Sequence, residues 1–150
     1  MARDSRKFIW TKMITAALLL GVSGSAMAGF DFVFTPNISG GFGNYRWDVN
    51  VESAAAVPNP GLKLLRGHTY SLHANASLTH PFWIKTAPST GATNAYSPAT
   101  TELDGNDLTA AGTLIFTPGA STPDRLYYDC GNHFEMQGVI DVPLFADGFE

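Results

Sequence analysis

The sequence predicts an all-β domain, a β-sandwich, that follows a cleavable export signal. Three observations lead to this prediction. Short apolar runs with strand-like alternation recur along residues 43–144, and turn-forming residues separate them. No segment after residue 28 repeats apolar side chains at the helical spacing. The first 28 residues have the composition of a signal peptide.

The signal peptide is recognised by its three parts. Four basic side chains begin it, residues 14–22 form an apolar core, and the small residues Ala-Met-Ala at 26–28 form a cleavage site. The apolar core is short for a bilayer span, which favours cleavage over an uncleaved anchor. We therefore expect a periplasmic or secreted protein with no membrane span after cleavage.

The chain that follows cleavage has the size of one domain and an acidic balance. It carries five basic and twelve acidic residues, a net charge of −7 with histidine neutral. No basic patch remains to neutralise phosphates, so nucleic acid is not expected as a partner. We divide this part into an N-terminal extension or edge segment at 29–42, the domain at 43–144 and a tail at 145–150.

The strands are expected in order along the domain. An apolar run at 30–34 is a candidate first strand, before the extension becomes rich in Gly and Asn. Apolar and polar residues then alternate over 45–52, which predicts a half-buried strand with Trp47 in the core. A connecting loop follows at 53–61. The remaining strands are expected at 62–65, 69–74, 81–86, 113–117, 126–130 and 139–142.

Residues 87–112 contain no sustained apolar period and are rich in small polar residues. A loop of this length in a compact domain is either functional or folded on itself. Tyr96 and Leu103 are the side chains expected to attach it to the core.

The last two expected strands flank the most distinctive stretch of the chain. Cys130 is the only cysteine, and His133 and Met136 follow it in the pattern C-x2-H-x2-M. Alternation places Cys130 on the inward face of its strand. A single cysteine in an exported protein forms no internal disulfide, which leaves an intermolecular bridge, a free thiol or a metal ligand. The spacing of His133 and Met136 favours the metal ligand.

Thiolate, imidazole and thioether groups are the soft ligands that copper selects. A trigonal copper site needs a second histidine, and His80 is the candidate because alternation places it on the face of Phe82 and Ile84. His68 and His73 lie in a different pair of strands and lack a matching motif, so we expect them at the surface or in hydrogen bonds. The predicted ligands are His80, Cys130, His133 and Met136. A binuclear centre with two bridging thiolates is excluded because the chain has one cysteine.

With this pattern, the chain resembles the cupredoxins, the type 1 blue copper proteins. The upstream motif HPFWIKT at 80–86 and the segment LYYDCGNHFEMQG at 126–138 carry the resemblance, and the short ligand loop is similar to that of amicyanin. The resemblance covers residues 43–144. It implies a Greek-key β-sandwich that binds one type 1 copper ion through the four predicted ligands.

The resemblance implies an exported carrier of single electrons and not an enzyme. A redox protein would dock near His133, with Phe134 and Pro81 as its apolar neighbours, and the carrier is expected to be a monomer. Three alternatives stay open: a copper-handling module of the same fold, a metal-free binding module, and an enzyme with Cys130 as its nucleophile and His133 as its base.

The sequence departs from the better-known cupredoxins beside the ligands. In those proteins an Asn commonly follows the upstream His and bonds to a Ser or Thr after the Cys. Here these positions are Pro81 and Gly131, which have no side-chain hydrogen-bonding groups. Because such bonds orient ligands and tune the metal, we expect different support for the site and carry over no reduction potential.

Overall fold

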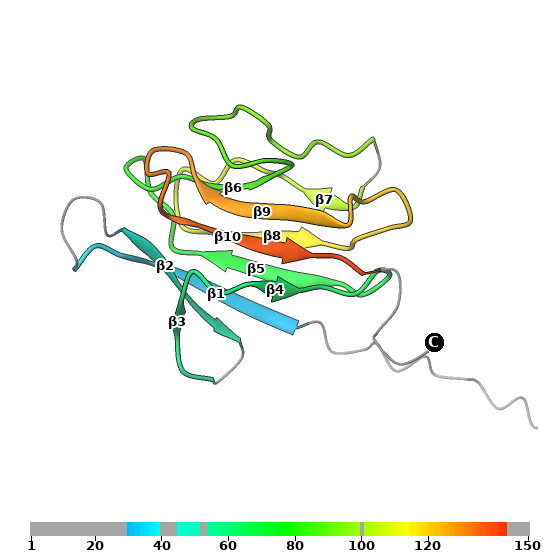
Figure 1. The fold of residues 1–150 in the computed structure, drawn as a ribbon, viewed down its shortest axis with the longest axis horizontal. Helices are drawn as coiled ribbons and strands as arrows, with labels where there is room; N and C mark the ends of the chain where they lie inside the picture. The colour runs from blue at the N-terminus through cyan, green and yellow to red at the C-terminus, as the bar shows by residue number, and fades with distance from the viewer. Residues whose placement is uncertain (1–29, 40–44, 52–53, 100, 144–150) are drawn as a thin grey trace, which may run out of the picture.

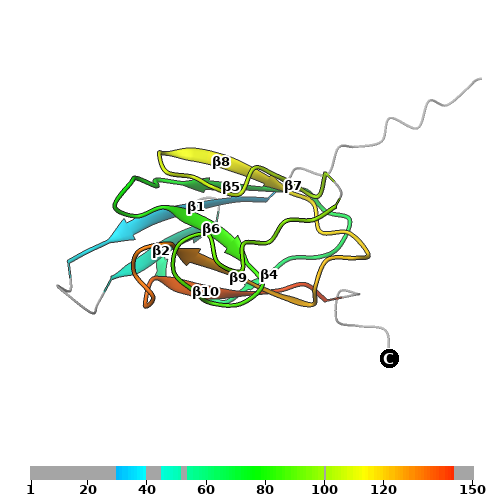
Figure 2. The ribbon, with the colours of Figure 1, turned by 90° about the horizontal axis from the view of Figure 1, so that it is seen from above.

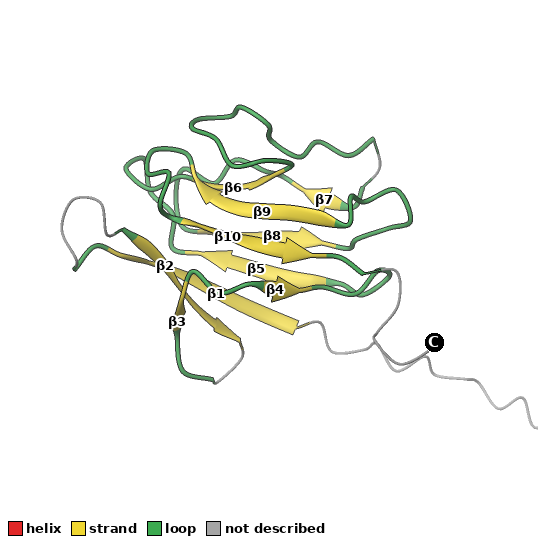
Figure 3. Ribbon diagram, viewed as in Figure 1, coloured by secondary structure: helices red, strands yellow, loops and turns green. Residues whose placement is uncertain are grey.

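The structure, a computed structural model, describes residues 30–39, 45–51, 54–99 and 101–143. These residues form two β-sheets packed face to face, with loops at both ends (Figure 1, and from above in Figure 2). Strands and loops account for all of the described ranges (Figure 3). A helix long and apolar enough to cross a membrane is not found in them. The predicted signal peptide and the tail at 145–150 lie outside the described residues.

Ten strands make up the two sheets. They are β1 Phe30–Asn37, β2 Arg46–Val51, β3 Val57–Pro58, β4 Leu62–Lys63, β5 Tyr70–Ala74, β6 Phe82–Lys85, β7 Leu103–Asp104, β8 Gly112–Phe116, β9 Arg125–Cys130 and β10 Gln137–Asp141. The larger sheet has the order β3-β2-β1-β5-β8-β7 and the smaller sheet the order β4-β10-β9-β6. Both sheets are mixed, because β1 pairs with β5, and β10 with β4, in parallel. The chain passes repeatedly from one sheet to the other, so the predicted all-β sandwich is confirmed.

The first strand differs from its prediction in both length and position. It runs through Asn37 and lies inside the larger sheet, paired with β2 on one side and β5 on the other. The expectation of an edge segment at 29–42 is therefore wrong for the described part of that range. Phe32 and Phe34 explain the interior position, since both are buried in the core between the sheets.

Four aromatic side chains fill the centre of the sandwich. Phe34 and Trp47 come from the larger sheet, Phe82 and Tyr128 from the smaller one, and all four are fully buried. The ring centroids of Phe34 and Phe82 are 4.7 Å apart, and those of Trp47 and Phe82 are 5.3 Å apart. Such tilted and edge-on pairs add to the stabilisation from apolar burial. Cys130 continues the inward face of β9 and pairs in register with Phe82, so its thiol lies at one end of this aromatic core.

The long segment at 87–112 covers the edge of β6 that faces away from β9. The backbone of Phe82 exchanges two hydrogen bonds with Leu108, and the Tyr96 N–H donates to the Ile84 carbonyl over 2.8 Å. A covered edge offers no free backbone groups to other chains. Tyr96 is buried and Leu103 packs against the core, as predicted. The segment also contains β7, and the predicted loop at 53–61 contains β3; both two-residue strands are too short to leave a periodic pattern.

Asn106 completes this edge with its side chain. Its Nδ2 donates to the carbonyls of Ile84 (2.6 Å) and Tyr96 (2.8 Å), and its Oδ1 accepts from the Ile84 N–H over 2.6 Å. The carboxamide thus takes the place of a peptide group in the sheet.

We expect Asn106→Ala to lower the free energy of unfolding by about 2 kcal/mol or more, because it leaves the Ile84 N–H and the Tyr96 carbonyl without these partners. Urea denaturation followed by tryptophan fluorescence measures the loss. Asn50→Ala is the control, since Asn50 makes one exposed bond to the Ala54 carbonyl and should cost under about 1 kcal/mol. Equal losses in the two variants would contradict this role of Asn106.

Candidate metal centre

The end of β9 and the six-residue loop that joins it to β10 carry three of the four predicted ligands, and two backbone bonds close the loop. The Cys130 N–H donates to the Met136 carbonyl over 2.9 Å, and the Met136 N–H donates to the His133 carbonyl over 3.0 Å. These bonds connect the residues that bear the thiol, the imidazole and the thioether. A six-residue segment is thereby folded tightly at the end of a two-stranded ladder.

His80 arrives from a separate turn just before β6. Ser77 and His80 exchange backbone hydrogen bonds of 3.1 and 3.0 Å, and the Ser77 hydroxyl also accepts from the His80 N–H. Pro81 then leads the chain into β6. The turn therefore ends at His80 and directs its ring towards the end of β9.

The structure brings His80, Cys130 and His133 together. One nitrogen from each imidazole and the Cys130 Sγ lie within 4.8 Å of one another. The Sγ is 3.6 Å from the His133 Nδ1, and the centroids of the two imidazole rings are 4.7 Å apart. The predicted histidine and the ligand loop therefore meet at one point, although 50 residues of chain separate His80 from Cys130.

The Nδ1 of His80 is the atom that most directly indicates a missing ligand at this site. The residue is half-buried, but its Nδ1 is fully buried and has no hydrogen-bond partner among the described residues. A buried polar atom without a partner costs free energy unless something else satisfies it. The cluster of thiol and imidazole beside this atom indicates a metal ion as the missing partner.

Protonation at the cluster follows from burial. Burial lowers the pKa of His80, and the neighbouring His133 lowers it further, so the neutral ring with a free lone pair is favoured. Burial raises the pKa of the Cys130 thiol, while the backbone N–H groups of Asn132 and His133 act in the opposite direction. Without a cation this sulfur is a protonated, fully buried thiol. A metal ion would supply the positive charge that a thiolate needs.

Met136 is also fully buried and lies at the end of the same loop. Its backbone closes the loop, as described above. Its role as an axial ligand through the thioether sulfur stays a prediction. His73 and His68 do not belong to the cluster: His73 lies in the larger sheet, where its Nδ1 bonds to the Thr113 hydroxyl over 2.7 Å.

Tyr45 is a neighbour of the site that the sequence pattern did not identify. Its ring centroid is 4.3 Å from that of His133 and 5.9 Å from that of His80, and both contacts are edge-on. The ring therefore packs on both imidazoles. Alternation puts Tyr45 on the face of Trp47, but nothing in the sequence says that this end of the strand lies beside the ligands.

Backbone groups replace the side-chain bridge that is missing beside the ligands. The Gly131 N–H donates to the Pro81 carbonyl over 3.0 Å, which joins the two residues that follow Cys130 and His80. A methyl group at residue 131 would lie 3.0 Å from Pro81 and from the Trp83 indole nitrogen. The glycine thus permits the close approach of the two segments. At this contact a backbone hydrogen bond connects the two ligand segments where the better-known cupredoxins use side chains.

A buried ion pair lies next to Cys130 on the outer face of the smaller sheet. The Lys85 Nζ is 3.4 Å from the Asp129 Oδ2, and both side chains are fully buried. Ser89 joins them: its carbonyl accepts from Lys85 over 2.6 Å, and its N–H donates to Asp129 over 3.1 Å. Burial raises the pKa of Asp129, opposed by the Ser89 amide and Lys85. The pair therefore fastens the segment after β6 against β9.

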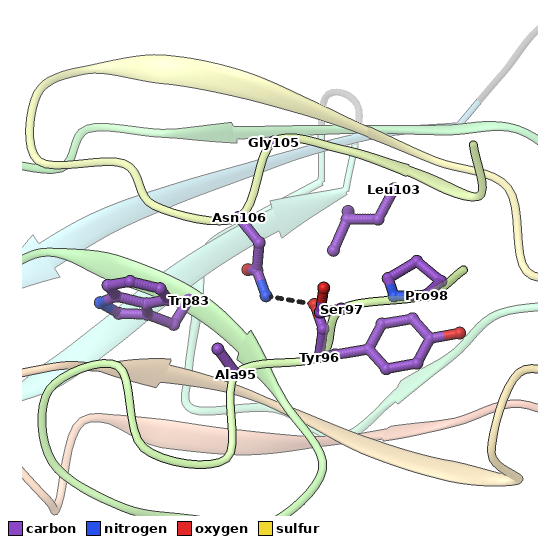
Figure 4. A pocket seen from close by; sticks show the side chains of 8 residues that line it. All are labelled: Trp83, Ala95, Tyr96, Ser97, Pro98, Leu103, Gly105 and Asn106. Atoms are coloured by element: carbon purple, nitrogen blue, oxygen red, sulfur yellow. Dashed lines mark hydrogen bonds between the residues drawn. The ribbon is translucent and has the colours of Figure 1, made fainter. Parts of the chain in front are cut away.

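A cavity of about 340 Å³ lies away from the cluster, under the segment that covers β6 (Figure 4). It is lined by Trp83, Ala95, Tyr96, Ser97, Pro98, Leu103, Gly105 and Asn106. The hydrogen bond from Asn106 to the Tyr96 carbonyl joins two of these lining residues. None of the four predicted ligands lines it, so the cavity and the cluster are separate features.

The fold and the cluster define a small β-sandwich protein with a buried thiol–imidazole site. No protein-family profile matches the chain, and no curated protein matches it. Similar solved structures include rusticyanin from Thiobacillus ferrooxidans (19% identity, 75% of this chain and 76% of that one, TM-score 0.44) and reduced rusticyanin (22%, 75% and 78%, 0.45). Another is a purple cupredoxin from Nitrosopumilus maritimus (12%, 75% and 98%, 0.41). At such values no residue role is transferred.

Proposed function

We propose that this chain binds one copper ion through His80, Cys130, His133 and Met136 and carries single electrons between redox partners. The observation that carries the proposal is the convergence of two imidazoles and the only thiol of the chain within 4.8 Å. Two histidines and a cysteine in one plane, with a weak axial methionine, are the ligands of blue-copper electron-transfer sites.

The spacing of the donor atoms fits a metal ion. Imidazole and thiolate donors bonded to a first-row ion at about 2.1 and 2.3 Å, 120° apart, are separated by about 3.8 Å. The Cys130 Sγ and the His133 Nδ1 are 3.6 Å apart. The buried Nδ1 of His80 has no other partner in the described residues. Thiolate and thioether groups select copper over harder cations. When bound, copper would supply a reversible one-electron couple.

The residues of the chain would hold this site with little change of shape. Cys130 is fixed in β9, and its N–H bonds back to the loop that it begins. His80 is fixed by its closed turn, and Tyr45 packs on both imidazoles. Fixed ligands limit the rearrangement that accompanies a change of charge, and this favours rapid electron exchange.

The surface beside His133 is suited to a redox partner. Phe134 is 56% exposed and Leu78 is 80% exposed. They lie one residue after His133 and two residues before His80, so a partner that covers these apolar side chains would reach the site. We propose that a redox protein docks here and that His133 is the ligand nearest to it. The expected export signal places this exchange outside the cytoplasm.

A nucleophilic enzyme fits the same cluster less well. The Cys130 Sγ and the His133 Nδ1 are 3.6 Å apart, close enough for a thiol–imidazole pair. Cys130, however, is fully buried, and burial raises the pKa of its thiol. A reactive cysteine is a partly exposed thiolate with a lowered pKa. The geometry therefore supports a metal ligand over a nucleophile.

The test is visible absorption of the purified protein loaded with Cu(II). We expect an intense thiolate-to-copper band that bleaches reversibly with ascorbate and that Cys130→Ser removes completely, because the serine oxygen supplies no comparable charge transfer. His73→Ala is the control and should keep the band, since His73 lies in the other sheet. Tight Cu(I) binding without a band would support copper handling instead. Equal alkylation of Cys130 with and without copper would contradict any metal role.

A further inference from the structure

The two segments that carry the ligands are joined by one side chain. Asn132 lies between Gly131 and His133 on the ligand loop, and its Nδ2 donates to the carbonyls of Leu78 and Thr79, each over 3.0 Å. Both facing atoms are carbonyl oxygens, so only the amide nitrogen can satisfy them. The carboxamide therefore uses both of its hydrogens on the turn that ends at His80.

The position of these bonds connects them to the site. Asn132 is adjacent to His133, and Thr79 is adjacent to His80. A second tie, from the Gly131 N–H to the Pro81 carbonyl, joins the residue before Asn132 to the residue after His80. The two ties therefore hold the chain on both sides of His80 against the part of the ligand loop that precedes His133.

We propose that Asn132 is a positioning residue, which holds the turn of His80 against the ligand loop so that the cluster is formed before a metal ion binds. The proposal rests on the proposed function for the identity of the ion. Polar groups behind the ligands of metal sites typically account for about 10- to 100-fold in metal affinity. Asn132 supplies such a polar group through its side-chain amide. It lies one residue after Gly131, the position where the better-known cupredoxins have a bridging Ser or Thr.

The first arm of the test uses the metal-free protein and needs no copper. In Asn132→Ala, amide hydrogen exchange of Gly131 and His80 should accelerate about tenfold, because their hydrogen bonds lie in the two segments that separate. Asn75→Ala is the matched control: Asn75 is also exposed, and its Nδ2 joins two segments of the larger sheet through Thr35. It should leave both exchange rates unchanged.

The second arm measures release of Cu(I) to a chelator. We expect release to accelerate at least about tenfold in Asn132→Ala and also in Asn132→Asp, which keeps the shape of the side chain but loses its donor. An added negative charge would by itself strengthen the binding of a cation. Weakened binding in both variants therefore identifies the lost amide donor as the cause.

The two arms separate the possible failures. Exchange and release rates within about twofold of the wild type in both Asn132 variants would overturn the positioning role. If the wild-type protein binds no copper, the proposed function fails, and the exchange arm alone decides whether Asn132 holds the two segments together. Faster release with unchanged exchange in the metal-free protein would also overturn it, because the cluster would then not be held before the ion binds.

Discussion

Gly138→Ala is expected to lower the free energy of unfolding by about 3 kcal/mol or more, the upper range for overpacking a core. Gly138 lies in β10 directly opposite Tyr128 in β9. A methyl group at residue 138 would overlap the Tyr128 ring, with the ring Cε1 only 2.6 Å away. The ring cannot retreat, because it is fully buried and packs on Phe34 with centroids 5.1 Å apart. Its hydroxyl also donates to the Pro60 carbonyl over 2.7 Å.

Urea denaturation of the metal-free variant measures this loss. Gly61→Ala is the matched control, because no heavy atom lies within 4 Å of the added methyl group and the backbone needs no positive φ. It should stay within about 0.5 kcal/mol of the wild type. Adding Tyr128→Phe to Gly138→Ala should return part of the loss, since the hydroxyl is one of the overlapping groups. A loss as small as that of Gly61→Ala would show that the ring moves freely.

Lys85→Met is expected to cost about 3–5 kcal/mol, the typical loss when one member of a buried ion pair is removed. Methionine fills the space of the lysine stem but leaves Asp129 buried without its cation. The Asp129 Oδ1 already has no hydrogen-bond partner among the described residues. The Ser89 carbonyl would also lose the bond from Lys85.

A double variant separates charge from packing. Lys85→Met combined with Asp129→Leu removes both charges, and it should recover most of the stability lost in Lys85→Met, because apolar replacements of buried pairs are often neutral. Lys63→Met is the control for loss of a cation at an exposed position and should change stability by no more than about 1 kcal/mol, the upper range for an exposed charge interaction. Thermal unfolding followed by circular dichroism compares the four proteins. A double variant as unstable as Lys85→Met would contradict the charge argument.

Local features of this protein could be predicted from sequence because they depend on alternation and spacing. The strands β5, β8 and β9 follow the expected runs closely, since their inward faces are apolar at every second residue. Cys130, His133 and Met136 lie within seven residues of one another, so the short chain between them keeps them in one region of the structure. The place of His80 was predicted from alternation, which puts it on the same face as Phe82 and Ile84. The prediction was correct for its position beside Cys130, although β6 itself begins only at Phe82.

Features that depend on which segments meet could not be predicted in the same way. Tyr45, the residue before β2, touches both imidazoles because the start of β2 lies beside the ligand loop, and no local pattern encodes that neighbour. Asn106 and Asn132 look like ordinary loop residues in sequence, yet each bonds to backbone carbonyls of a distant segment. The interior place of β1 has the same origin, because its partners β2 and β5 are chosen by the packing of both sheets.

The interior place of β1 also makes the larger sheet depend on the first strand of the described residues. This strand alone joins β2 and β3 to β5, β8 and β7. Removal of Phe30–Asn37 would therefore split that sheet into two unconnected parts and leave its register partners, which include the buried Trp47 and Leu72, without this neighbour. Any truncated version meant for metal binding has to keep this strand intact.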